Sequence, residues 1–430
     1  MEEAVSFISV SGDSDFTLSN IPFGVFRKAS DSSFEPHVGV AIGDKVLDLF
    51  AVAETGLFEN CAPDSPLRGS PDVVFRQRSL NNFIRLGKKC HSEVRQLLQR
   101  ALAKDSPVCP QLERSAESED ENPFFHEQSA VQMLLPVEVG DYTDFYASKE
   151  HASHLGLMMR GPGNELPPNY LHLPIGYHGR ASSIVVSGTQ IRRPWGQIQP
   201  VESGVPHFRP TERLDFELEV GAIIGQDSVL GERVRIDCSR DYIFGYVLVN
   251  DWSARDVQRW EYQPLGPFNS KNFGTSISPW VVLQEALEPF RVPAPRQDPP
   301  VLEYLNQNLN RSNFDLNLNV YLNGKEISRC NFRGMYWTFE QMIAHHTSTG
   351  CNLRCGDLIA SGTVSGKEPG TYGSLIELCW GGKDPLVLPD GSRRVFLEDH
   401  DEVVLRGHAG SGLQRVGFGV CSGQILPAIG

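Results

Sequence analysis

The sequence lacks an excess of positive charge. Its 39 lysine and arginine residues are outnumbered by 53 aspartate and glutamate residues, which gives a formal net charge of −14 and an isoelectric point near 5.4. Nucleic acids and anionic membranes attract basic surfaces. The composition therefore argues against both partners, although cations that cluster locally can still bind a small anionic substrate.

Long apolar runs are also missing. No stretch approaches the roughly 20 apolar residues that cross a bilayer, and residues 1–5 carry two glutamates where a secretory signal has basic residues. The nine cysteines are scattered without framework spacing, which is typical of free thiols in a reducing compartment. We therefore expect a cytoplasmic protein without membrane spans.

Several common catalytic motifs are absent. The sequence has no G-x-S-x-G elbow, no H-E-x-x-H and no phosphate-binding glycine motif, which argues against serine hydrolases, zincins and common nucleotide enzymes. Cys351 and Cys355 lie close to His345 and His346, but their C-x-x-x-C spacing is not that of a zinc finger. We interpret these residues as structural thiols and a polar helix end.

The chain is long enough for two domains. Its 430 residues, 40% of them hydrophobic, can form a large core. Residues 21–28 and 36–42 have strand patterns, and Gly43-Asp44 before residues 45–49 indicates a two-residue hairpin. Apolar residues then recur at helical spacing between residues 80 and 102, which predicts one or two amphipathic helices.

An acidic segment follows at residues 105–127. It opens with turn-forming residues and continues through Glu113, Glu117, Glu119, Asp120 and Glu121. Such a segment is typical of a solvated linker. We place the domain boundary after it, so the predicted domains are residues 1–135 and 136–430.

Beyond this boundary the pattern favours short strands between Gly- and Pro-rich turns, with one helix at residues 338–345. The predicted strands are residues 184–186, 244–249, 316–322, 375–378, 403–405 and 416–420. Many short strands of this kind indicate a large β-sandwich or roll. The predicted fold class is therefore mainly β, of the α+β type.

Residues 214–220 alternate strictly between apolar and acidic side chains. This period of two predicts a half-buried strand, with Glu217 and Glu219 on one face and their Cα atoms roughly 6.6–7 Å apart. An isolated pair of this kind most often lies on a solvated face. Here residues 221–225 are apolar without alternation, as in a strand that enters the interior, where two carboxylates need a cation.

Two further carboxylates are candidates for the same site. Asp251 ends the apolar run 244–250, and Asp144 lies in the polar stretch 141–151. Taken alone, Asp251 is more simply a turn or helix cap. Four carboxylates without cysteine or histidine ligands suit Mg²⁺ or Ca²⁺ rather than zinc, and the sequence does not choose between these two ions.

Six segments of the chain resemble the fumarylacetoacetate hydrolase family. They are residues 141–146 (DYTDFY) followed by His151, 171–183 (LHLPIGYHGRASS), 251–256 (DWSARD), 264–268 (PLGPF), Lys271 with 273–275 (FGT), and 361–366 (SGTVSG). They occur in order between residue 136 and the C-terminus, with a weaker match before it, and together they are highly specific. Ala147 stands where the family motif has serine, and the acidic segment is longer than usual.

The resemblance implies a fold and a reaction. The expected fold is an N-terminal SH3-like barrel followed by a C-terminal β-roll, in a homodimer. The expected reaction is hydrolysis of a carbon–carbon bond in 4-fumarylacetoacetate, a small dicarboxylate, to fumarate and acetoacetate at the end of tyrosine breakdown.

The resemblance also assigns roles to residues of matching motifs. A divalent ion would be held by Asp144, Glu217, Glu219 and Asp251, with Lys271 and Thr275 nearby. His151 would be the general base and Glu377 its orienting carboxylate. Arg255, Gln258 and Lys271 would stabilise the oxyanion, and substrate would be bound by Tyr146, Arg160, Tyr177, Gln258, Tyr262 and Thr363.

These residue types suit the reaction. Histidine is the natural base near pH 7, and a carboxylate on its second nitrogen fixes the tautomer, although a lone histidine is more often structural. The alkoxide formed by water attack needs hydrogen-bond donors, and the enolate leaving group has two oxygens that can chelate a divalent ion. Arg160 is suited to a substrate carboxylate.

Two other interpretations remain open. A relative that hydrolyses an acylpyruvate, or that decarboxylates or hydrates a related keto acid, would share the metal site, but such relatives usually lack the long N-terminal domain. A catalytically silent, metal-stabilised binding protein would show no turnover. Against it stands the complete catalytic set of His151, Glu377, Arg255, Gln258 and Lys271.

Overall fold

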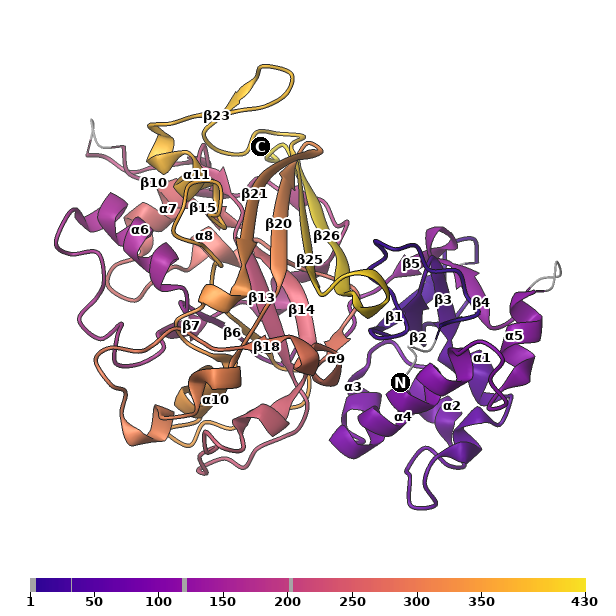
Figure 1. The fold of residues 1–430 in the computed structure, drawn as a ribbon. Coiled ribbons are helices and arrows are strands. Elements are labelled where there is room, and N and C mark those ends of the chain that lie inside the picture. Colours follow the sequence, from indigo (N-terminus) through magenta and orange to yellow (C-terminus); the bar gives the residue numbers. More distant parts are fainter. Residues whose placement is uncertain (1–4, 32, 118–121, 201–203) are drawn as a thin grey trace.

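The computed structural model describes residues 5–31, 33–117, 122–200 and 204–430. The fold in this part of the chain is mainly β, with three large sheets and with five helices grouped in the N-terminal third (Figure 1). Among the described helices, none has the length and apolar character of a membrane span. The acidic residues Glu119, Asp120 and Glu121, and the N-terminal residues 1–4, lie outside the described ranges.

The N-terminal third contains a five-stranded antiparallel sheet in the order β4-β3-β2-β1-β5. The bounds are β1 Phe23–Lys28, β2 His37–Ile42, β3 Lys45–Asp48, β4 Phe125–Glu127 and β5 Val131–Met133. The three predicted strands and the hairpin turn are confirmed, and Gly43 adopts the positive φ of 58° that this turn requires.

The acidic segment is not the continuous loop that was predicted. It contains helix α5 (Pro110–Ala116), and it ends in strand β4, which completes the N-terminal sheet. Apolar residues anchor both elements, because Leu112 and Phe125 are buried. The remaining helices of this third are α1 Leu49–Ala53, α2 Pro71–Phe75, α3 Asn81–Ile84 and α4 Lys88–Leu102, and the last two confirm the predicted amphipathic helices.

A central eight-stranded sheet runs in the order β7-β6-β22-β13-β14-β16-β8, with β17 also paired to β14. Its bounds are β6 Tyr142–Phe145, β7 Gly176–His178, β8 Ile184–Val186, β13 Leu218–Ile224, β14 Ile243–Asp251, β16 Thr275–Ile277, β17 Val282–Leu283 and β22 Leu358–Ala360. Strand β14 is buried along its whole length. Its side chains alternate between two cores: Tyr246 and Leu248 belong to one, and Val247 and Val249 to the other, which they share with the N-terminal third.

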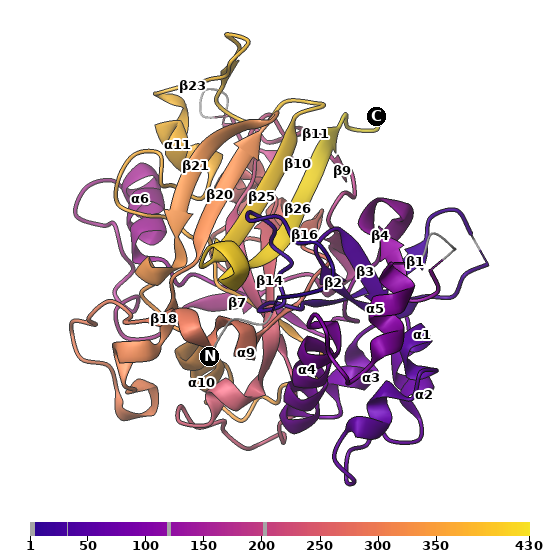
Figure 2. The same ribbon diagram turned by 45° about the vertical axis from the view of Figure 1, so that its right-hand side comes forward.

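A second five-stranded sheet, in the order β21-β20-β25-β26-β9, packs on the first of these cores (Figures 1 and 2). Its bounds are β9 Ile191–Arg192, β20 Asn317–Leu322, β21 Lys325–Asn331, β25 Glu402–Ala409 and β26 Val416–Leu426. Short two-stranded pairs complete the β-structure: β10 Trp195–Ile198 with β11 His207–Pro210, β12 Leu214–Asp215 with β15 Ser253–Ala254, β18 Arg291–Val292 with β19 Asn313–Phe314, and β23 Leu386–Val387 with β24 Arg393–Arg394.

The helices of this larger part were predicted incompletely. Helix α10 (Phe339–His346) is confirmed, and Thr338 and Gln341 form a capping box at its start. Helix α6 (Lys149–Arg160) was missed, although Ser148 accepts a hydrogen bond from the backbone N–H of His151 as its N-cap. The other helices are α7 Arg255–Glu261, α8 Asn269–Asn272, α9 Gln284–Leu287 and α11 Leu375–Leu378.

Two strand predictions are wrong in detail. Residues 375–378 form α11, because both oxygens of Asp215 accept hydrogen bonds from backbone N–H groups of its first turn. Residues 214–220 are not one half-buried strand: they divide into β12 and β13, and both faces are buried. Side chains interrupt the ladder at this point, since Asp215 binds the N–H of Phe216 and Asn250 binds the N–H of Glu217.

Candidate active site

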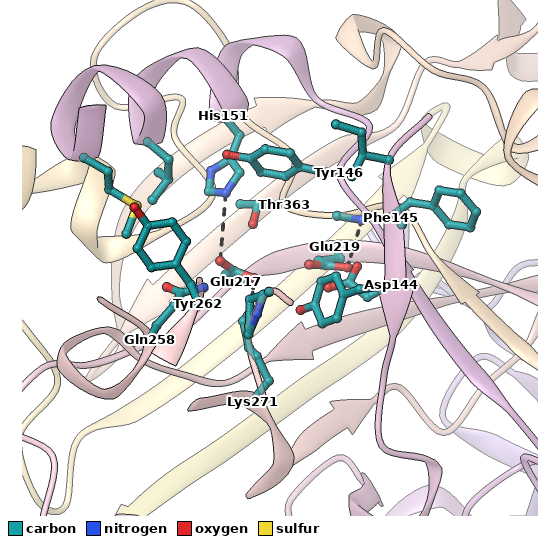
Figure 3. A pocket seen from close by; sticks show the side chains of 18 of the residues that line it. Asp144, Phe145, Tyr146, His151, Glu217, Glu219, Gln258, Tyr262, Lys271 and Thr363 are labelled. Atoms are coloured by element: carbon teal, nitrogen blue, oxygen red, sulfur yellow. Dashed lines mark hydrogen bonds and ion pairs between the residues drawn. The ribbon is translucent and has the colours of Figure 1, made fainter. Parts of the chain in front are cut away.

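One cavity of about 290 Å³ brings most of the predicted site residues together (Figure 3). It lies beside the start of β13, between helices α6 and α7. Twelve of the fifteen predicted residues line it: Asp144, Tyr146, His151, Arg160, Tyr177, Glu217, Glu219, Arg255, Gln258, Tyr262, Lys271 and Thr363. The other three stand directly behind this wall, where Glu377 contacts His151 and where Asp251 contacts Lys271 and Thr275.

Four buried carboxylates meet at the base of the cavity. Asp144, Glu217, Glu219 and Asp251 each offer one oxygen, and these oxygens all lie within 4.8 Å of one another. Asp144 comes from β6, Glu219 from β13 and Asp251 from the end of β14, while Glu217 precedes β13. The central sheet therefore assembles the group from four separate positions in the sequence.

The local charge of this group is not balanced by the protein. The four carboxylates and the adjacent Asp215 face two buried cations, Arg255 and Lys271. Burial, followed by repulsion from neighbouring carboxylates, raises the pKa of Asp144 and of Glu219 well above the usual range.

Two oxygens of the group are unpaired. Oδ1 of Asp144 and Oε1 of Glu219 are buried, and neither has a hydrogen-bond partner among the described residues. Buried carboxylate oxygens without donors are costly, and hard divalent cations bind such oxygens. The donor set therefore fits a hard divalent cation.

Glu217 is the member of the group that the protein itself keeps charged. Its carboxylate forms ion pairs with Lys271 and with Nη2 of Arg255, the latter at 2.8 Å. Burial opposes ionisation, but Lys271, Arg255 and His151 together lower the pKa of Glu217 to about 2. Lys271 also pairs with Asp251 at 2.5 Å, and these carboxylates raise the pKa of its amine against the effect of burial.

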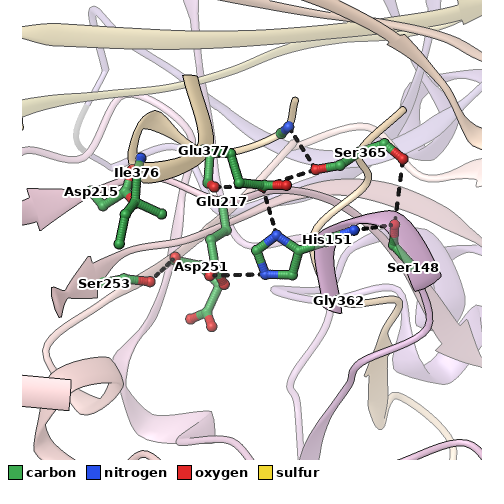
Figure 4. A network of polar contacts seen from close by, with 12 residues as sticks. Ser148, His151, Asp215, Glu217, Asp251, Ser253, Gly362, Ser365, Ile376 and Glu377 are labelled. Atoms are coloured by element: carbon green, nitrogen blue, oxygen red, sulfur yellow. Dashed lines mark hydrogen bonds and ion pairs between the residues drawn. The ribbon is translucent and has the colours of Figure 1, made fainter. Parts of the chain in front are cut away.

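His151 connects the carboxylate group to a second polar network (Figure 4). Its Nδ1 lies 2.6 Å from Oε2 of Glu377, and its Nε2 lies 3.9 Å from Oε1 of Glu217. The Glu377 side chain is fully buried and also accepts hydrogen bonds from Ser365 and Ser374. Burial alone would raise the pKa of Glu377, but His151 and the other donors hold it well below its usual range.

The residues expected to bind substrate have different surroundings. The buried hydroxyl of Thr363 has no partner among the described residues, and the Tyr146 ring lies 5.5 Å from the His151 ring. The Tyr177 hydroxyl approaches Asp251 at 3.5 Å. Arg160 lines the cavity from the end of α6, and its guanidinium donates to the carbonyls of Asn164 and Glu165.

Comparisons with known proteins agree with this geometry. Residues 141–425 match the family model described as fumarylacetoacetate (FAA) hydrolase C-terminal, and residues 19–136 match that of fumarylacetoacetase N-terminal. The chain is 48% identical to a fumarylacetoacetase of Arabidopsis thaliana over 432 residues, which cover 98% of each chain. It is 47% identical to a fumarylacetoacetase of Homo sapiens over 431 residues, which cover 99% of each chain.

The chain belongs to the fumarylacetoacetase family. A solved structure of a fumarylacetoacetate hydrolase from Exiguobacterium antarcticum has the same fold at 16% identity, with a TM-score of 0.51 and coverage of 95% of this chain and 99% of that one. The resemblance inferred from the sequence motifs is therefore confirmed.

Several residues of the site were not anticipated from the sequence. Asp215 forms a buried ion pair with Nε of Arg255 at 2.7 Å and caps α11, which carries Glu377. His154 binds the second oxygen of Glu377 at 2.8 Å. Asp215 was visible as part of the alternating pattern, and His154 follows His151 at the i, i+3 spacing of one helix face, but without a predicted helix α6 this spacing carried no signal.

Proposed function

We propose that this protein is a metal-dependent hydrolase that cleaves the carbon–carbon bond of fumarylacetoacetate to give fumarate and acetoacetate. The observation that carries the proposal is the position of His151. One nitrogen of its ring is bound to a buried carboxylate, and the other faces the four-carboxylate group in the same cavity. This geometry supports the proposal, because a hydrolysis of this kind needs a base close to a bound cation.

His151 activates the water. The 3.9 Å between its Nε2 and Oε1 of Glu217 is too long for a hydrogen bond, so Nε2 remains available to a water in the cavity. Nε2 takes a proton from this water as the water attacks the carbonyl carbon. The proton on Nδ1 stays in its hydrogen bond to Glu377. The negative charge of Glu377 stabilises the imidazolium that forms, and protonated His151 can return a proton to the leaving carbon.

Gln258 and the two buried cations stabilise the alkoxide. Nη1 of Arg255 donates to Oε1 of Gln258 at 3.1 Å, which leaves the amide N–H groups of Gln258 available to the cavity. Arg255 and Lys271 contribute positive charge in a water-poor site, where preorganised charge has a large effect. A divalent ion would be held by Asp144, Glu217, Glu219 and Asp251 and would supply Lewis-acid stabilisation of negative charge on the substrate.

Tyr146, Tyr177, Tyr262 and Thr363 hold the substrate along the cavity, and Arg160 binds one of its carboxylates. Replacing Arg160 by glutamine is expected to raise KM by about 10- to 100-fold with little change in kcat, because the guanidinium binds ground state and transition state alike. Steady-state kinetics on the purified variant test this role. A loss confined to kcat would instead place Arg160 at the reacting atoms.

The proposed family function also implies a division of the chain into two domains. We place an SH3-like barrel in residues 1–135 and the catalytic β-roll, with sandwich-like packing of its sheets, in residues 136–430. The sheet order and the separate matches of residues 19–136 and 141–425 support this division. We also assign a homodimer that degrades a tyrosine-derived dicarboxylate in the cytoplasm.

Removal of divalent metal is expected to abolish the activity. The decay of fumarylacetoacetate absorbance, with fumarate measured as product, is followed for the untreated protein, after EDTA, and after Mg²⁺ or Ca²⁺ is restored. We expect stoichiometric fumarate, loss of turnover with EDTA and recovery with at least one ion. No turnover by folded protein under any of these conditions would overturn the proposal and favour the acylpyruvate-type relatives.

A further inference from the structure

A second histidine binds the carboxylate that orients His151. Nδ1 of His154 lies 2.8 Å from Oε1 of Glu377, whereas Nδ1 of His151 lies 2.6 Å from Oε2. Both histidines belong to α6. Because residues three apart share a helix face, one turn of α6 presents both rings to the same carboxylate.

The two oxygens of Glu377 are held very differently. Oε2 has three donors, namely His151, Ser365 and Ser374. Among the described residues, Oε1 has no hydrogen-bond partner other than His154. Since the Glu377 side chain is fully buried, loss of the His154 donor leaves a carboxylate oxygen without a partner in the interior.

His154 itself does not reach the substrate cavity. Its ring packs between Tyr372, at 4.7 Å between ring centroids, and Trp380, at 5.7 Å. It is absent from the residues that line the cavity, and its side chain is 15% exposed. His154 therefore acts on hydrolysis indirectly, and its hydrogen bond to Glu377 is the contact that leads to His151.

We propose that His154 is a positioning residue that fixes the Glu377 carboxylate so that Oε2 stays on Nδ1 of His151. Its donor and the Ser365 and Ser374 hydroxyls act on opposite oxygens and together prevent the carboxylate from rotating. Without the His154 donor, the carboxylate turns to find another partner, and the ring of His151 is less well oriented. This inference rests on the proposed hydrolysis only for its kinetic consequence.

Three variants separate the donor from the ring. His154→Phe keeps an aromatic ring between Tyr372 and Trp380 but has no donor, whereas the side-chain amide of His154→Asn places a donor near the position of Nδ1. His345→Phe is the matched control, because it removes a ring nitrogen that contacts the Tyr304 hydroxyl at 3.0 Å, in a half-buried position outside the cavity.

We expect His154→Phe to lower kcat by about 10- to 100-fold, the usual effect of losing such an outer hydrogen bond, with KM unchanged within about threefold. His154→Asn is expected to recover most of kcat, and His345→Phe to match the parent protein. A His154→Phe protein that keeps its kcat would overturn the proposal. So would a His154→Asn protein as impaired as His154→Phe, because the loss of activity would then not follow the loss of the donor.

A second readout needs no substrate. The Nδ1 proton of His151, in a short hydrogen bond to a carboxylate, gives a far-downfield proton NMR signal that is assigned by its loss in His151→Gln. We expect this signal to move in His154→Phe and to stay in place in His154→Asn and His345→Phe. An unmoved signal in His154→Phe overturns the positioning role even if the parent protein does not hydrolyse fumarylacetoacetate, an outcome that would refute the proposed function separately.

Discussion

Replacement of His151 by alanine is expected to lower kcat for fumarylacetoacetate by about 10²–10⁴-fold, the contribution typical of a general base. The ring stands between Glu377 and the carboxylate group, and in the proposed mechanism its Nε2 receives the proton. The four carboxylates do not depend on it for position, because three of them lie on strands of the central sheet and Glu217 directly precedes β13. Metal affinity, measured by calorimetry, should therefore change little.

The matched control is His207→Ala, since His207 is an exposed histidine on β11 outside the cavity. Its kcat and melting temperature should equal those of the parent protein. If the His151→Ala protein retained its activity while remaining folded, His151 would not be the base and another group would have to activate the water.

Replacement of Glu219 by glutamine is expected to weaken divalent-metal binding by about 100-fold or more and to reduce activity in parallel. Glu219 contributes an otherwise unpaired carboxylate oxygen to the group, and affinity for hard cations depends on the number of carboxylate ligands. In the absence of metal, the same substitution is not expected to destabilise the folded protein. Removing one of several crowded buried carboxylates relieves repulsion, so the metal-free melting temperature should not fall.

Thermal unfolding with and without Mg²⁺ or Ca²⁺ measures both effects, because a ligand that binds only the folded state raises its stability with concentration. The gain produced by metal should shrink in Glu219→Gln and persist in Glu232→Gln, an exposed acidic control. An unchanged metal dependence of both activity and melting temperature would show that the four carboxylates are not the metal site.

The sequence predicted correctly those helices and strands that depend on residues close to one another in the chain. The hairpin at Gly43 and the amphipathic spacing of α4 depend on neighbouring residues, and both were found as predicted. The errors arose where a distant side chain decides the structure. Asp215 caps the first turn of α11 from 160 positions earlier in the sequence, and the Asn250 side chain accepts a hydrogen bond from the backbone N–H of Glu217. Neither contact produces a periodic pattern in the sequence.

In the candidate site, too, local patterns could be predicted from the sequence and contacts between distant residues could not. The acidic alternation at Glu217 and Glu219 indicated a cation site, and the burial of both side chains agrees with the less common of its two interpretations. The pairing of His151 with Glu377 came from the family resemblance, because 226 positions separate them. The hydrogen bond between His154 and Glu377 was missed. Predicting it requires that α6 be recognised as a helix and that its buried face be identified.

Because β14 is buried on both faces, a substitution in the N-terminal third can affect the distant end of this strand. One side of this strand supports the core shared with the N-terminal third, and its last residue is the carboxylate Asp251. Phe83 of α3 packs edge-on against Phe244 near the other end of the same strand, at 6.1 Å between ring centroids. The N-terminal third therefore supports the strand that carries Asp251 of the four-carboxylate group. A substitution where Phe83 meets Phe244 is expected to disturb that group without changing any residue that lines the cavity.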